Sequence, residues 1–276
     1  MKILKSITLI CVLASAALAD FQDRTLVASE PNRMNNESYF VKPVQIIDCP
    51  TASILRGGHF RAGIRAYQQG GLLASLSVGI SSRIMFGVSY GGLHIIGAEQ
   101  QVKWNPMPGV HFVYRIFDES MRLPAFVIGF DSQGYGPHFT GDPDDPAYDE
   151  KINGRYDFKS RGFYTVVSKG YSTFIDAGLH AGASYSLEND GSESAPTLFM
   201  GADLHLAPDL ALLMEYDFAI NDNHIHSKGI FNIGVRWAFG PNMFFEFDLK
   251  NMLGSDDKNP DVRRILKLTY YGSVLQ

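Results

Sequence analysis

Residues 229–250, GIFNIGVRWAFGPNMFFEFDLK, show the pattern that decides the fold. Apolar side chains occupy every second position on either side of the short joint 240–241: Phe231, Ile233, Val235, Trp237 and Phe239 before it, and Met243, Phe245, Phe247 and Leu249 after it. A period of two is typical of β-strands, in which successive side chains point to opposite faces of a sheet. The stretch therefore predicts two consecutive strands, each with one apolar and one polar face.

The same period dominates the chain from residue 58 to residue 272. It predicts twelve strands, near 59–67, 72–81, 83–90, 109–117, 124–132, 160–168, 173–186, 196–206, 209–219, 229–239, 242–250 and 262–271. Helical patterning is confined to a weak candidate near 93–103. The sequence therefore predicts an all-β fold.

The connections between these strands alternate in length. Short joints lie near Ser82 and at 118–123, 169–172, 207–208 and 240–241. Five of the six intervening joints are clearly longer, at 91–108, 133–159, 187–195, 220–228 and 251–261, and the exception is 68–71. Bacterial outer-membrane barrels have short periplasmic turns, long outer loops and an even number of antiparallel strands. We therefore expect an up-and-down antiparallel transmembrane β-barrel of about 12 strands, with both termini in the periplasm. Fourteen strands remain the alternative if residues 39–47 pair and one further strand is added.

The two faces of the strands agree with a barrel in lipid. A membrane barrel turns its apolar side chains outward and its polar ones into the lumen, and a water-soluble barrel does the reverse. We expect acyl chains to contact Leu76, Val78, Phe86, Val235 and Phe245. Aromatic residues recur near the strand ends, where interfacial girdles belong: Tyr67, Tyr90, Tyr135, Tyr185, Tyr216, Phe218, Trp237, Phe239, Tyr270 and Tyr271.

Composition excludes several other classes of protein. Of the 276 residues, 45% are apolar and 19% are charged, which is too apolar for a disordered chain. A helical membrane bundle needs several runs of ~20 apolar residues, but the one long apolar run lies at the extreme N-terminus. The net charge of −5 gives no basic footprint for nucleic acid.

The N-terminal region divides into two parts. Residues 1–19 have the Lys2 and Lys5 n-region, a short apolar core and an Ala17–Ala19 cleavage site, which predict a secretory signal peptide. Residues 20–57 are expected to form a periplasmic segment before the barrel of 58–276, although Tyr39–Ile47 could add a strand or tuck into the barrel mouth. Removal of the signal leaves Cys49 as the single cysteine, which predicts a plain structural residue and no intrachain disulfide.

Several short motifs resemble those of one family. Ile46-Ile47-Asp48-Cys49-Pro50-Thr51-Ala52, followed by Gly57-Gly58 and a strand, resembles the start of YjbH-type outer-membrane barrels associated with exopolysaccharide export. The resemblance continues through 129–136, 164–184, Gly201-Ala202-Asp203 and Glu215-Tyr216-Asp217. It covers roughly residues 46–272 and implies a single barrel unit with a role in polysaccharide traffic.

Two features could support an enzyme acting on outer-membrane lipid. Gly87-Val88-Ser89-Tyr90-Gly91 matches G-x-S-x-G, the motif of a nucleophile on a strand-to-helix turn. His180 and His205 are predicted to share the lumen with Asp176 and Asp203. Because no βαβ pattern surrounds Ser89, a strand end is the preferred interpretation. An internally hydrogen-bonded polar cluster is preferred for the histidines, so we do not expect an enzyme.

Two loops carry residue types that bind metals. Asp222, His224 and His226 alternate in a polar loop, and such ligands suit zinc or copper. Residues 141–150 contain five acids that could attract calcium, but their spacing does not match an EF-hand. Solvated loops are the preferred interpretation of both, so we expect no metal and no cofactor.

The polar faces predict a charged lumen. Its expected lining, which would bind or select solutes, is Arg61, Arg65, Arg83, Arg115, Asp176, His180, Asp203, His205, Glu215, Asp217, Glu246, Asp248 and Lys267, with Arg236 and Lys250 pairing locally. Barrels of about eight strands are filled by side chains and barrels of about 16–18 strands leave an open channel, so the lumen of a twelve-stranded barrel is intermediate in width. These charges therefore either bridge and close the lumen or line a narrow pore.

The leading hypothesis is a narrow channel, or a barrel that binds saccharides or other solutes. The alternatives are a structural or export-accessory barrel that docks periplasmic partners through 20–57, and a lipid- or lipopolysaccharide-modifying enzyme. Expected partners are outer-membrane lipid and lipopolysaccharide, a polysaccharide or small hydrophilic solute, and the barrel-assembly machinery, but not nucleic acid.

Overall fold

The computed structural model describes residues 42–97, 100–140, 154–172, 175–188, 195–222, 228–254 and 262–274. This part of the chain contains fifteen strands: β1 His59–Tyr67, β2 Gly71–Gly79, β3 Ile84–Leu93, β4 Lys103–Trp104, β5 Gly109–Phe117, β6 Ala125–Asp131, β7 Tyr135–Phe139, β8 Arg155–Phe158, β9 Gly162–Ser172, β10 Asp176–Tyr185, β11 Thr197–Ala207, β12 Leu210–Asp217, β13 Ile230–Ala238, β14 Met243–Lys250 and β15 Arg263–Ser273. Within these described ranges no helix is long and apolar enough to cross a membrane.

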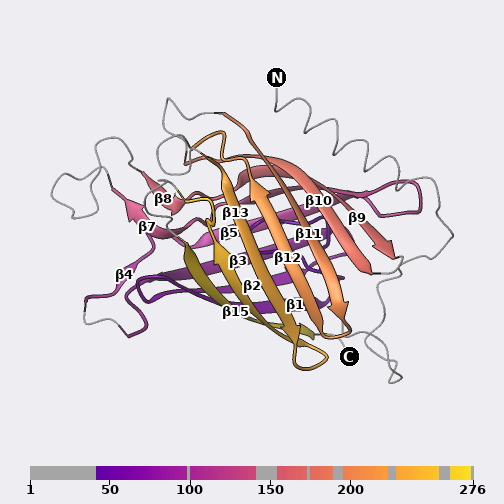
Figure 1. Cartoon of the computed structure of the whole chain (residues 1–276), viewed down its shortest axis with the longest axis horizontal. Coiled ribbons are helices and arrows are strands. Elements are labelled where there is room, and N and C mark those ends of the chain that lie inside the picture. Colours follow the sequence, from indigo (N-terminus) through magenta and orange to yellow (C-terminus); the bar gives the residue numbers. More distant parts are fainter. Residues whose placement is uncertain are drawn as a thin grey trace.

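Twelve of the strands close into one antiparallel barrel. β1 pairs with both β2 and β15, and β2 pairs in turn with β3, so the ring has no free edge. The remaining neighbours follow chain order from β3 through β5, β6 and β9 to β15 (Figure 1). The expected fold class and the twelve expected strands are confirmed, and the fourteen-strand alternative is wrong because residues 42–57 add no strand to the ring.

Three short strands lie outside the ring and were not predicted. β4 pairs with the outer end of β3, inside the stretch where a helix was a weak candidate. β7 and β8 form a separate two-stranded hairpin within the long loop between β6 and β9. Figure 1 shows β4, β7 and β8 at the end of the barrel opposite to the C-terminus. The long loops therefore lie at one end, which we call the outer end, and the short turns lie at the other.

The barrel exterior is apolar, as expected. Leu76, Phe86, Val235 and Phe245 are 38–46% exposed, and Val78 is half-buried beside them. Exposed aromatic rings cluster toward both ends of the barrel. They include Tyr90 stacked on Trp104 and the Phe130–Phe163 pair toward the outer end, and Trp237 with Phe239 at the turn end. An apolar outer band between aromatic girdles is the surface that a bilayer requires.

Three of the aromatic residues expected in the girdles point inward instead. Tyr135 is 6% exposed, Tyr67 packs against the same apolar cluster, and Tyr271 packs against a second inner cluster. Tyr271 follows the outward-facing Tyr270, and adjacent strand residues must face opposite sides. For Tyr135 the reason is different, because it belongs to the β7–β8 hairpin rather than to a ring strand.

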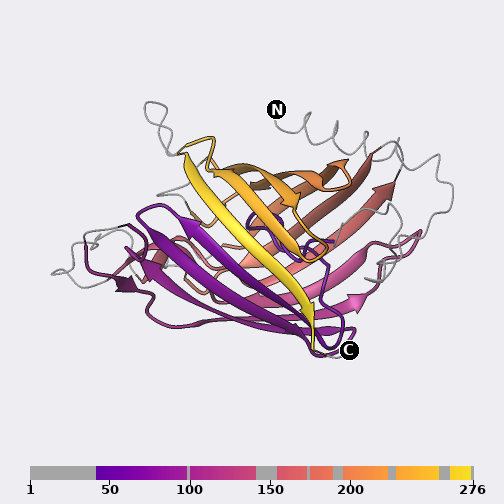
Figure 2. The same cartoon turned by 90° about the horizontal axis from the view of Figure 1, so that it is seen from below.

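Residues 42–57 enter the barrel, and we call them the plug segment. In Figure 2 the indigo start of the described chain curls within the ring of strands. Ile46, Ile47, Cys49 and Ala52 are at most 1% exposed. This part of the expected periplasmic segment 20–57 therefore lies in the lumen, and residues 1–41, including the expected signal peptide, lie outside the described residues.

Candidate functional site

The plug segment folds back on itself inside the lumen. At its start, Lys42 forms a 2.7 Å ion pair with Glu119 in the β5–β6 turn. Thr51 N–H donates to Val44 O and Ile46 N–H donates to Cys49 O, both at 3.0 Å. These bonds bring together the two arms of the plug segment, residues 42–45 and 50–57. The chain thus enters from the turn end, reverses at residues 46–49 and returns to β1. We call residues 46–49 the plug tip.

One acidic side chain of the wall holds the backbone of the plug tip. Glu215 on β12 accepts hydrogen bonds from Asp48 N–H at 2.8 Å and from Cys49 N–H at 2.7 Å. Its second oxygen accepts a bond from the Asn232 side-chain amide. Glu215 is 2% exposed, so its charge is compensated by these donors rather than by water. A predicted lumen acid therefore binds the plug segment.

The predicted lumen cations bind the carbonyl groups of the same segment. Arg65 donates to Ile47 O at 3.0 Å, and Lys267 donates to the same oxygen at 2.7 Å. Two further bonds, from Arg236 to Gln45 O at 3.0 Å and from Arg115 to Ala52 O at 3.1 Å, secure its arms. Charged groups on several strands thereby satisfy a backbone that has no strand partner.

Apolar contacts fix the plug segment from its other side. Val44, Cys49, Ala52 and Leu55 pack in one cluster with inward side chains of the wall: Met85, Val113, Ala125, Val127, Tyr164, Val166 and Phe199. Ile46 and Ile47 pack with Ala211 and Leu213. Full burial of a Val, Leu or Ile side chain stabilises by about 1.5–3 kcal/mol each. These contacts make the plug segment part of the folded barrel.

Two wall glycines make room for the isoleucines of the plug tip. A Cβ atom at Gly201 on β11 would lie 2.6 Å from Ile46 Cδ1. A Cβ atom at Gly234 on β13 would lie 2.0 Å from Asp248 Oδ1 and 3.3 Å from Ile47 Cδ1. Distances below 3 Å are not compatible with van der Waals packing, so a side chain at Gly201 would displace Ile46.

At the plug tip, the Asp48 side chain joins the plug segment to the outer end of the barrel. Its carboxylate forms an ion pair with Arg65 Nη1 at 2.9 Å and a second one with Lys250, the last residue of β14. It also accepts a 2.6 Å hydrogen bond from the Tyr135 hydroxyl of the β7–β8 hairpin. Asp48 is 7% exposed. Three donors from the barrel and its outer hairpin therefore surround one carboxylate of the plug segment.

Behind the plug tip, buried charges form a continuous network. Arg236 and Lys267 pair with the two oxygens of Glu246 at 2.7 and 3.0 Å, and Lys267 also pairs with Asp248 at 3.1 Å. Arg236 therefore pairs locally, as the sequence predicted. Lys250, for which local pairing was also predicted, pairs instead with Asp48.

The histidine cluster forms a hydrogen-bonded chain that ends on the plug segment. His180 bridges Asp203 Oδ1 and Ser168 Oγ, both at 2.7 Å, and His205 contacts the other Asp203 oxygen at 3.1 Å. Ser168 Oγ accepts the Ala52 N–H at 2.8 Å. Ser168 and His180 are each 7% exposed, so the plug segment covers the one Ser–His–Asp chain seen in the described part of the protein.

The G-x-S-x-G candidate has a different environment from the one that catalysis needs. Ser89 lies within β3, in register with Ser75 and Gly109, and donates a 3.1 Å hydrogen bond to Gln133. A nucleophile elbow requires a sharp turn from a strand into a helix. The motif is therefore a regular piece of barrel wall.

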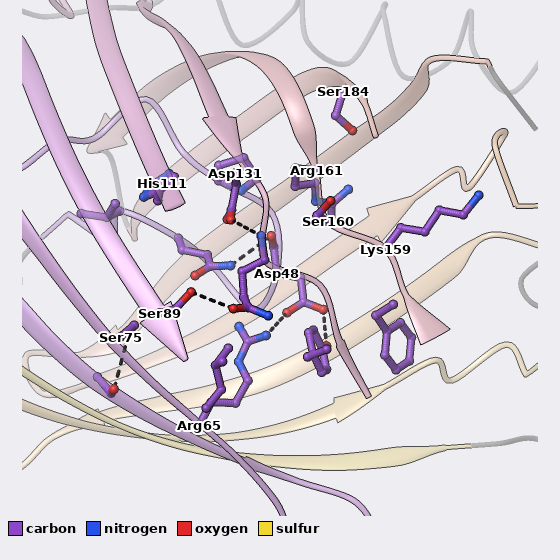
Figure 3. A pocket seen from close by; sticks show the side chains of 18 of the residues that line it. Asp48, Arg65, Ser75, Ser89, His111, Asp131, Lys159, Ser160, Arg161 and Ser184 are labelled. Carbon is purple, nitrogen blue, oxygen red and sulfur yellow. Dashed lines mark hydrogen bonds and ion pairs between the residues drawn. The ribbon is translucent and has the colours of Figure 1, made fainter. Parts of the chain in front are cut away.

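A polar cavity of about 150 Å³ remains beside the plug segment, with room for on the order of ten water molecules. It extends from loop residues 159–161 and 219–222 at the outer end to Val44 and Pro50 of the plug segment. Its wall includes small hydroxyl side chains: Ser75, Ser77, Ser89 and Thr269. Figure 3 shows Arg65 below Asp48, with Lys159, Ser160 and Arg161 across the cavity.

Arg61 is the cation of this cavity that lacks a counter-ion within the described ranges. It lines the cavity, and its buried Nε has no hydrogen-bond partner there. Arg161, by contrast, pairs with Asp217 and approaches Cys49 Sγ at 3.6 Å. Within the described residues the cavity therefore presents the Arg61 guanidinium, without an ion pair, next to hydroxyl groups and the Asp131 carboxylate.

The structure brings most of the expected lining residues together in the lumen: Arg61, Arg65, Arg115, His180, Asp203, His205, Glu215, Asp217, Glu246, Asp248 and Lys267. Two lie elsewhere. Arg83 is in the β2–β3 turn and pairs with Asp118, and exposed Asp176 at the start of β10 bonds to Ser172. Both were placed in the lumen because the predicted strands began too early. Asp48 and Tyr135 were not predicted, because neither lies on a ring strand.

The two metal candidates lie almost entirely outside the described residues. Asp222 is buried and pairs with Arg155 at 2.7 Å, while His224, His226 and residues 141–150 lie outside the described ranges. No group of three or more potential ligands converges elsewhere in those ranges.

Comparisons with known proteins match the fold only. No family model and no curated protein matches the chain. Among solved structures, the KdgM porin is 10% identical, with a TM-score of 0.45 over 77% of this chain and 98% of that one. Omp33 of Acinetobacter baumannii is 9% identical (TM-score 0.41, 78% and 96% coverage), and the COG4313 channel of Pseudomonas putida F1 is 11% identical (0.41, 82% and 100%). At this identity the likeness extends to the barrel and to nothing finer.

Proposed function

We propose that this protein is a channel of the bacterial outer membrane for small hydrophilic solutes, held closed by its plug segment. The observation that carries the proposal is the polar cavity, which runs from the outer loops down to the plug segment. A barrel with a purely structural role does not require such a cavity or an arginine, Arg61, that lines it without an ion pair in the described residues. The apolar exterior requires a membrane, and closed barrels of this kind occupy the outer membrane.

The difference between the two ends of the barrel supports an orientation in the membrane. Short turns, the C-terminus and the entry of the plug segment lie together at one end, which we assign to the periplasm. The resemblance to YjbH-type barrels adds a polysaccharide or its fragments as the class of solute. Outer-membrane lipid, lipopolysaccharide and the barrel-assembly machinery are the partners that such a barrel requires.

Planar-bilayer recordings test the channel proposal. We expect rare openings in the parent protein and a larger open fraction in Glu215→Ala, which leaves the N–H groups of Asp48 and Cys49 without a buried acceptor. Each such loss costs about 1–3 kcal/mol. Glu119→Gln is the control, because its ion pair with the half-exposed Lys42 contributes about 0–1 kcal/mol.

The second candidate is a structural barrel without transport, which the extent of the buried ion-pair network favours. It predicts silence in both Glu215→Ala and the parent protein. Heat-modifiable migration on a gel confirms that each variant is folded before it is recorded.

A further inference from the structure

The Asp48 carboxylate occupies a site that is built to bind an anion. Arg65 forms an ion pair with one of its oxygens, and Lys250 and the Tyr135 hydroxyl reach the other. None of these donors belongs to the plug segment: they come from β1, β14 and the outer hairpin. The geometry of three convergent donors is what recognition of a carboxylate requires.

Withdrawal of the plug segment would leave that site with uncompensated charge. The Arg65 and Lys250 side chains are 11% and 3% exposed. Withdrawal breaks two ion pairs and the Tyr135 hydrogen bond at once, so the closed state is favoured as long as nothing replaces Asp48. A solute that supplies its own carboxylate to the same donors stabilises the open state in proportion to its binding there.

The cavity leads to this site. Asp48, Arg65, Tyr135 and Lys250 all line it, together with the hydroxyl wall and Arg61. The hydroxyl groups of Ser75, Ser77, Ser89 and Thr269 suit a solute rich in hydroxyl groups. A carboxylate and a set of hydroxyl groups on one small molecule describe a sugar acid or a related hydroxy acid.

We propose that Asp48 is an internal stand-in for a carboxylated, polyhydroxylated solute, which opens the channel by taking over Arg65, Lys250 and Tyr135. This inference rests on the proposed channel function and adds the class of solute and the way it acts. The plug segment is then released by competition at its tip, while the contacts of its two arms remain to reclose the lumen.

Cys49 provides a direct readout of release. It is fully buried beside Asp48, so a membrane-impermeant maleimide labels it when the plug tip leaves its site. The full-length protein in liposomes is labelled with D-glucuronate, with D-glucose, or with neither. The two sugars share a ring and differ in whether C6 is a carboxylate or a hydroxymethyl group. Cys49→Ser shows that the label is on Cys49.

We expect glucuronate to raise the labelling rate of the parent protein about tenfold and glucose to leave it unchanged. Asp48→Asn should label rapidly without any sugar and respond little to glucuronate, because it has already lost the ion pairs with Arg65 and Lys250 that hold the plug tip. Asp209→Asn is the matched control, because Asp209 lies in the β11–β12 turn and bonds to exposed Trp237. It should behave like the parent protein.

Equal labelling with the two sugars overturns the inference, as does an Asp48→Asn variant that labels no faster than the parent. If Glu215→Ala conducts while glucuronate has no effect, the channel proposal stands and the role of Asp48 is wrong. If neither variant conducts although Asp48→Asn labels rapidly, the plug segment moves but the barrel is not a channel.

Discussion

The carboxylate of Asp48 and the ammonium group of Lys250 form a buried ion pair although 202 residues separate them in the sequence. Asp48 is at the tip of a segment that enters from the turn end, and Lys250 is at the outer end of β14. The plug segment therefore reaches from Glu119 at the turn end to Lys250 at the outer end of the barrel. The Asp48–Lys250 pair connects the tip of the plug segment to a strand of the barrel wall.

Filling the space beside the plug tip should release it. In Gly201→Leu the new side chain occupies the position of Ile46, so we expect faster labelling of Cys49 and a larger open fraction. Met200→Leu places the same side chain on the adjacent, 40% exposed outer position and should change neither quantity. Unchanged labelling in Gly201→Leu would show that the tip does not depend on this contact.

Closure should weaken in alkaline solution through Cys49. Burial raises the pKa of its thiol, and the nearby Glu215 carboxylate acts in the same direction. The docked segment thus favours the neutral thiol. Its contribution is fully present below the pKa of a free thiol, about 8.5, and is lost as the pH rises above that value.

The open fraction of the parent protein should therefore rise more steeply between about pH 8.5 and 10 than that of Cys49→Ser, in which this group cannot ionise. Recordings of both proteins across that range make the comparison. Identical pH profiles would mean that ionisation of Cys49 does not oppose docking.

The apolar exterior predicts that the free-energy cost of an outward-facing charge depends on its depth in the membrane. Val235 lies near the middle of β13 and is 41% exposed to lipid, so Val235→Arg should lower the free energy of folding into bilayers by about 2–4 kcal/mol. Phe239→Arg at the turn-end girdle should cost about 0–1 kcal/mol. Urea titration of folding into liposomes measures both. The reverse order would mean that the membrane band is misplaced.

Gly234→Arg, at the adjacent inward position, is a poor control for Val235→Arg because the new side chain would collide with Asp248.

The alternation of turns and loops predicts which side each faces. An epitope inserted after Met107, which is 66% exposed in the β4–β5 connection, should bind antibody on intact cells. The same epitope after Pro208, in the two-residue turn between β11 and β12, should bind only after the outer membrane is opened. Residues 141–150, in the longest predicted outer loop, lie outside the described residues, so Met107 is the chosen site. Antibody binding to the Pro208 epitope but not to the Met107 epitope on intact cells would mean that the barrel has the opposite orientation in the membrane.

The sequence predicted the ring well because the barrel is built from local patterns. The alternation in 229–250 sets both strands and both faces, and short joints such as 208–209 force consecutive strands to pair. To predict these strands and their faces, no contact beyond the neighbouring strand has to be known. The first strand was expected at 59–67, which is where β1 lies.

The plug segment could not be predicted in the same way. It has no period, and its partners are far away in the sequence: Glu215 is 167 residues from Asp48. One signal was present but was not used. Met85, Val113 and Val166 interrupt the polar face of their strands, and apolar side chains in a polar lumen need something apolar to cover them. Asp48 gave no such signal, because a lone acid in an irregular segment is ordinary.

The most direct test of the account is the conductance of a protein that lacks residues 43–55, recorded in planar bilayers beside the parent protein. The deletion removes the plug tip and the side chains that fill the lumen, and it keeps Gly57-Gly58 and every strand. We expect the parent protein to open rarely and the deletion variant to conduct steadily, with heat-modifiable migration showing that both are folded. A folded deletion variant that carries no more current than the parent protein would contradict the claim that this segment closes a channel.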